Sequence, residues 1–137
     1  MTKFALAAVL FLAGATAQAE LVEIKCKPNS QATVSQFMVV ANLAVDDDNS
    51  VMGTVQYATR SSATAQTSDV QTISVTGNLV VIPAGELATH EVESFQLIDE
   101  TDRLVRLKLN PSLEGPNSST MIINRKNRYS SQCKVVR

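Results

Sequence analysis

Hydrophobic and polar residues alternate along much of the chain after residue 20. In residues 22–26, apolar side chains alternate with charged ones, and the same period of two recurs in residues 37–45, 51–57 and 105–109. A period of two puts successive side chains on opposite faces of an extended strand. These segments therefore predict β-strands with one face buried and one face in solvent.

Turn-forming residues separate the predicted strands. Residues 46–50 (Asp-Asp-Asp-Asn-Ser) and 124–127 (Asn-Arg-Lys-Asn) each predict a hairpin turn. Gly77-Asn78 interrupts the β-branched segment 70–82, which favours a further tight turn; a bulge in one long strand is the alternative. The pattern predicts an all-β fold of eight or nine short strands, a mostly up-and-down antiparallel β-barrel or else a β-sandwich.

The first nineteen residues are typical of a cleaved signal peptide. Lys3 is followed by an apolar segment over 4–15 and by Ala17-Gln18-Ala19, which fits the small-x-small cleavage pattern. The apolar segment is shorter than the about 20 residues of a spanning helix. We therefore expect residues 1–19 to be removed and residues 20–137 to form a single all-β domain that does not span the membrane, in the periplasm or outside the cell.

Two cysteines lie near the two ends of the expected mature chain. An even number of cysteines in an exported domain predicts pairing, and Cys26 and Cys133 allow one connectivity. A disulfide requires their Cα atoms to lie within about 7 Å of each other. The first and last strands are therefore predicted to be neighbours, as in a closed barrel.

Charge is distributed unevenly along the chain. Between residues 28 and 102 there are ten acidic residues and one base, whereas residues 103–137 hold eight bases and one acid. Acidic and basic strands that screen each other explain this asymmetry, and a basic face for an acidic partner is the alternative. The formal net charge is −1, which argues against nucleic acid as a partner. Trp is absent and aromatic residues are few, so aromatic stacking platforms for bases or sugars are not expected.

One compact basic segment stands out as a candidate binding site. Arg125, Lys126 and Arg128 surround the predicted turn near the C-terminus. Three positive charges at an exposed hairpin tip can hold an acidic surface, a phosphate or a polyanion. A solvated turn that discourages aggregation is the simpler explanation.

Two other groups of side chains are candidates for chemistry. Asp46 and Asp48 could supply calcium ligands, but the complete calcium-loop pattern is missing and Asp is common in plain turns. His90 is the one histidine, and histidine is the residue that most often serves as a general base. No nucleophile motif accompanies it. The sequence predicts no cofactor and no resident metal.

We therefore expect a non-enzymatic binding protein. It would act through its loops or one face on a protein or envelope component, as an inhibitor or envelope-associated factor. A carrier barrel that encloses a small apolar ligand is the first alternative, and a hydrolase that uses His90 is the second.

Overall fold

Eight β-strands make up most of the computed structural model, which describes residues 19–28, 35–62, 65–85 and 89–136. Within these ranges no helix is long and apolar enough to cross a membrane. The predicted signal peptide lies outside the described residues, apart from Ala19 directly before the first strand. The strands are β1 (Glu20–Lys27), β2 (Gln36–Val45), β3 (Ser50–Arg60), β4 (Gln71–Ile82), β5 (Val92–Asp99), β6 (Val105–Leu109), β7 (Ser119–Ile123) and β8 (Asn127–Val136).

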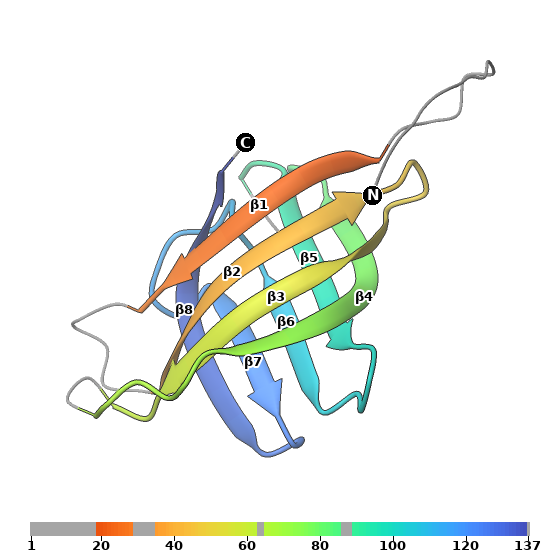
Figure 1. Ribbon diagram of the computed structural model, residues 1–137. Helices are drawn as coiled ribbons and strands as arrows, with labels where there is room; N and C mark the ends of the chain where they lie inside the picture. Colours follow the sequence, from red (N-terminus) through yellow and green to blue (C-terminus); the bar gives the residue numbers. More distant parts are fainter. Residues whose placement is uncertain (1–18, 29–34, 63–64, 86–88, 137) are drawn as a thin grey trace.

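The strands form a closed up-and-down barrel (Figure 1). Each strand pairs antiparallel with the next one along the chain, and β1 pairs antiparallel with β8 to complete the ring. One parallel bridge, between Gln36 and Ser130, adds a contact of β2 with β8. The prediction of an all-β barrel is confirmed, and the sandwich alternative is not what forms.

Apolar side chains fill the interior of the barrel. The alternation of residues 37–45 and 105–109 puts one face of β2 and of β6 inside, and the inward residues are buried. The bulkiest fully buried side chains are those of Phe37, Phe95, Ile24, Leu109 and Met121. The outward side chains of β6 are Arg106 and Lys108, whereas those of β2 are mostly apolar, so a packed core lies inside an outer surface of mixed polarity.

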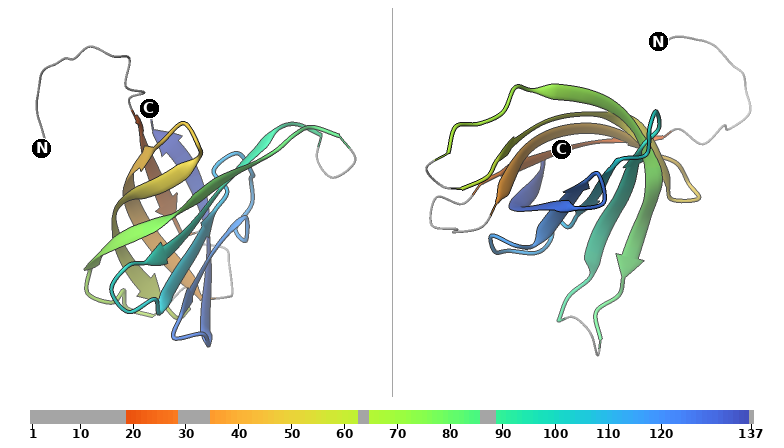
Figure 2. Two further views of the ribbon diagram at one scale, coloured as in Figure 1. Left: turned by 90° about the vertical axis from the view of Figure 1, so that its right-hand side faces the viewer. Right: turned by 90° about the horizontal axis from the view of Figure 1, so that it is seen from below.

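Strand β4 passes around a corner of the barrel without a break. Its first part pairs with β3 and its last part with β5, so the hairpin of β4 and β5 extends beyond the neighbouring strands (Figure 2). The turn expected at Gly77-Asn78 is therefore wrong, because both residues lie inside one strand. A Cβ atom at Gly77 would overlap the carbonyl oxygen of Gln96, so glycine allows the backbones of β4 and β5 to approach closely here.

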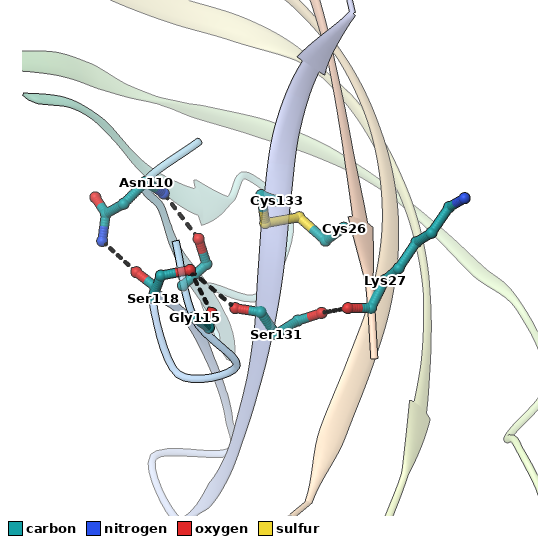
Figure 3. Close-up of a disulfide and its surroundings, with 8 residues drawn as sticks. Cys26, Lys27, Asn110, Gly115, Ser118, Ser131 and Cys133 are labelled. Atoms are coloured by element: carbon teal, nitrogen blue, oxygen red, sulfur yellow. Dashed lines mark hydrogen bonds between the residues drawn. A yellow bond between two sulfur atoms is a disulfide. The ribbon is translucent and has the colours of Figure 1, made fainter. Parts of the chain in front are cut away.

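A disulfide joins the two strands that close the ring. Cys26 and Cys133 are register partners with Cα atoms 3.9 Å apart (Figure 3). Beside them, the Ser131 hydroxyl donates a hydrogen bond of 2.6 Å to the Lys27 carbonyl. The predicted disulfide is confirmed, and it indicates a non-reducing environment of the kind that exported proteins meet.

Candidate functional site: a basic groove on the outer face

A shallow groove of about 580 Å³ crosses the outer face of the barrel from β4 to β8. We call it the basic groove. Its polar and charged lining comes from five strands and the loop that joins β5 to β6. The lining residues are Gly77, Asn78, Gln96, Leu97, Ile98, Arg103, Arg106, Leu107, Lys108, Thr120, Ile122 and Arg128.

The strand register arranges the outward side chains of the groove in two parallel rows. Residues that are register partners lie side by side across the sheet, and residues two apart on one strand occupy neighbouring rows. The arginine row consists of Ile98, Arg106, Ile122 and Arg128. The amide row consists of Asn78, Gln96, Lys108 and Thr120.

Positive charge in the groove has no acidic neighbour directly across the strands. Arg106 pairs with Ile98 on one side and with Ile122 on the other. Lys108 pairs with Gln96 and Thr120. No carboxylate therefore screens the two bases of β6 directly across the strands. The described lining carries four bases and no carboxylate, so its electrostatic potential favours an anion.

The loop between β5 and β6 holds Arg103 at the edge of the groove. The Asp99 carboxylate accepts a hydrogen bond of 2.8 Å from the Thr101 backbone N–H, and the Asp102 carboxylate accepts one of 3.1 Å from the Leu104 N–H. These short-range bonds fix the loop conformation. Arg103 has a φ of 59°, an uncommon conformation for a residue with a side chain.

The structure separates the three bases that the sequence singled out. Arg125 and Lys126 are exposed in the turn between β7 and β8, outside the lining of the groove, whereas Arg128 lies on β8 inside it. The turn is tight: Asn124 and Arg125 have φ values of 57° and 62°. The Asn124 N–H also donates a hydrogen bond of 2.9 Å to the Leu104 carbonyl. Arg128 therefore joins a cluster of bases from another part of the chain.

The sequence pattern does not identify Arg103, Arg106 and Lys108 as neighbours of Arg128. A signal for two of them was present, because the alternation of residues 105–109 puts Arg106 and Lys108 on the solvent face of one strand. Their proximity to Arg128 depends on the pairing of β6 with β7 and of β7 with β8. The pattern of a single strand does not contain that information.

The carboxylates of Asp46 and Asp48 take part in the turn between β2 and β3. The Ser50 hydroxyl lies 2.6 Å from Asp48 Oδ1 and 3.3 Å from Asp46 Oδ2, and the Ser50 N–H donates to Asp48 Oδ1 at 3.0 Å. The bonds from Ser50 hold the pKa of the Asp48 carboxyl below its ordinary value. No group of three or more candidate metal ligands occurs within the described ranges, and the weaker alternative of calcium at Asp46 and Asp48 is not tested.

His90 lies on the surface with both ring nitrogens engaged. Its Nε2 is 3.3 Å from the Ser112 carbonyl oxygen, and its Nδ1 is 3.3 Å from the Thr89 hydroxyl. A carbonyl oxygen can only accept, so Nε2 carries the proton in the neutral ring and Nδ1 accepts from Thr89. This arrangement links the start of β5 to the loop between β6 and β7, and Nδ1 already has a hydrogen-bond donor.

No protein-family model, curated protein or solved structure matches this chain.

Proposed function

We propose that this protein is an exported, non-enzymatic binding protein that holds an acidic macromolecular partner in the basic groove. The observation that carries the proposal is the lining of the groove, which places Arg103, Arg106, Lys108 and Arg128 on one outer face without a carboxylate among them. Such a surface attracts acidic partners over a distance and orients them as they approach. The partner is a protein or another component outside the cytoplasm, in the periplasm or beyond.

The packed interior supports an outer binding surface over a carrier function. A barrel of eight strands has room for side chains or for one small ligand. Phe37, Phe95 and Met121 are fully buried in this one, so bulky side chains occupy the space that an apolar ligand would need. The two ring nitrogens of His90 contact a backbone carbonyl and a threonine hydroxyl, which offers little support for the hydrolase alternative.

Retention of a partner on the immobilised protein tests the proposal. Extracts of the source cell envelope and medium are passed over the unchanged protein, over the double variant Arg106→Gln/Arg128→Gln and over the matched variant Arg125→Gln/Lys126→Gln. Both variants lose two positive charges, but only the first loses them from the groove. We expect one partner to be held by the unchanged protein and the matched variant, to be lost by the groove variant, and to be released by salt. Equal retention on all three, or none on any, would contradict the proposal.

A further inference from the structure

We infer that the basic groove binds a linear acidic polysaccharide in which a sugar that carries a carboxylate alternates with a neutral sugar. This inference rests on the proposed function and specifies the chemistry of the partner. It follows from the spacing of positive charge in the arginine row and from the neutral polar side chains of the amide row. The arginine row binds the carboxylates of such a polymer, and the amide row binds its neutral polar groups.

The arginine row repeats its charge at every second strand. Arg106 lies on β6 and Arg128 on β8, and Ile122 of β7 lies between them. Neighbouring strands are about 4.8 Å apart, so the two arginines leave the sheet about 9.6 Å apart. One sugar advances a linear polysaccharide by close to one strand spacing. Carboxylates on alternate sugars can therefore face the two arginines while the neutral sugar lies over Ile122.

An extended polypeptide fits this spacing less well. Side chains on one face of a strand recur at about 6.8 Å and then at about 13.6 Å, and neither distance equals two strand spacings. In a helix, side chains seven residues apart lie on one face about 10.5 Å apart. This distance is close to the spacing of the two arginines, but it accounts for the arginine row alone. The backbone N–H and C=O groups within a helix bond to each other, so only its side chains could meet the amide row.

The amide row and the isoleucines match what sugars offer. Asn78 and Gln96 each have two N–H donors and one carbonyl acceptor, and Thr120 adds a hydroxyl. Sugar hydroxyls and acetamido groups both donate and accept, so they can use this mixture. Ile122 is half-buried in the lining, and its methyl groups can pack against the C–H face of a sugar ring. An aliphatic side chain thus takes the place that an aromatic one has in many sugar sites.

Charge at the other end of the amide row limits where the polymer lies. Ser50 of β3 is the register partner of Asn78, and it bonds to the carboxylates of Asp46 and Asp48. These carboxylates repel an anionic chain that extends past β4. The acidic sugars are therefore confined to β6–β8, where Arg106 and Lys108 serve one carboxylate and Arg128 serves the next.

Calorimetric titration of the full chain tests the inference. The probe is an oligosaccharide of alternating glucuronate and N-acetylglucosamine, and the comparison ligands are a neutral oligosaccharide of N-acetylglucosamine and a glutamate homopeptide. We expect the alternating oligosaccharide to bind, the neutral one not to bind, and Arg106→Gln/Arg128→Gln to weaken binding about tenfold or more. The matched variant Arg125→Gln/Lys126→Gln should remain within about twofold, and thermal unfolding shows whether each variant folds.

The comparison ligands separate failure of this inference from failure of the proposed function. Binding of the glutamate peptide through Arg106 and Arg128, without binding of the alternating oligosaccharide, overturns the inference and leaves the proposed function intact. Equal binding of the oligosaccharide to the unchanged protein and to Arg106→Gln/Arg128→Gln overturns the inference as well. A variant Ile122→Thr that weakens binding of the oligosaccharide but not of the peptide supports it. If neither the alternating oligosaccharide nor the glutamate peptide binds, the inference fails. The proposed function is then tested by the retention experiment with envelope extracts.

Discussion

Cys26 and Cys133 are direct partners across the seam between the first and the last strand of the barrel. Their Cα atoms are 3.9 Å apart although 107 positions separate them in the sequence, and both side chains are buried. The neighbouring residue pairs of β1 and β8 are also in register. Backbone pairing therefore continues on both sides of the disulfide. The pairing of β1 with β8 already closes the barrel without the disulfide. We therefore expect the disulfide to stabilise the protein mainly by restricting the unfolded chain.

Removal of the disulfide should destabilise the barrel without opening it. In the chain-entropy account, a link that closes a loop of 107 residues stabilises the fold by about 4–5 kcal/mol. We expect Cys26→Ala/Cys133→Ala to lower the free energy of unfolding by close to this amount while the circular dichroism of the sheet is retained. Urea unfolding of the two proteins measures the difference. An unchanged midpoint would show that the closure contributes nothing to stability.

Phe37 and Met38 provide a direct test of which face of β2 is inside. Phe37 is fully buried, whereas Met38 is 37% exposed. Phe37→Ala should lower the free energy of unfolding by about 3–5 kcal/mol, because it leaves a cavity in the core. Met38→Ala should change it by less than about 0.5 kcal/mol. Comparable losses for the two variants, measured by urea unfolding, would mean that the register of β2 is different.

Gly77 should not tolerate a side chain. A methyl group at this position would overlap the Gln96 carbonyl oxygen, which belongs to the backbone of β5 and cannot rotate away. We expect Gly77→Ala to cost roughly 1–3 kcal/mol of unfolding free energy. Gly85 is the control, because a Cβ atom there meets nothing within 4 Å. If Gly77→Ala melts at the same temperature as Gly85→Ala, the close approach of β4 and β5 is not a constraint on this residue.

The course of the strands could be predicted from local patterns, because alternation decides which side chains are buried. Residues 37–45 and 105–109 show a period of two, and they form the strands expected. The turn predicted at Gly77 is wrong because a glycine within a β-branched segment can mean a turn or a close backbone approach. Only the position of the partner strand β5 distinguishes the two meanings.

The candidate site was predictable to a smaller extent. Arg128 was identified because it lies in a compact basic segment of the sequence. Arg106 and Lys108 become its neighbours only through two successive strand pairings. Arg103 depends in addition on the loop conformation that Asp99 and Asp102 hold in place. A charged surface that is assembled from several strands has no signature in any one of them.

The hydroxyl of Tyr57 lies in an environment that opposes its ionisation. Burial has the largest effect and raises the pKa of Tyr57 above its ordinary value of 10.0, and the negative charges of Asp99 and Asp102 raise it further. The folded protein therefore keeps this proton at a pH where the unfolded chain has lost it. The contribution to stability is fully present below pH 10 and is lost as the pH rises from there through the pKa of the folded state.

Alkaline unfolding measures this contribution. We expect the free energy of unfolding, obtained from urea titrations at a series of pH values above 10, to fall more steeply for the unchanged protein than for Tyr57→Phe. Since phenylalanine cannot ionise, the variant loses the part of the slope that comes from this hydroxyl. Asp99→Asn removes one neighbouring negative charge, so the tyrosinate absorbance assigned to Tyr57 by difference from Tyr57→Phe should appear at a lower pH. Equal slopes for Tyr57→Phe and the unchanged protein would mean that the Tyr57 hydroxyl ionises as readily in the barrel as in the unfolded chain.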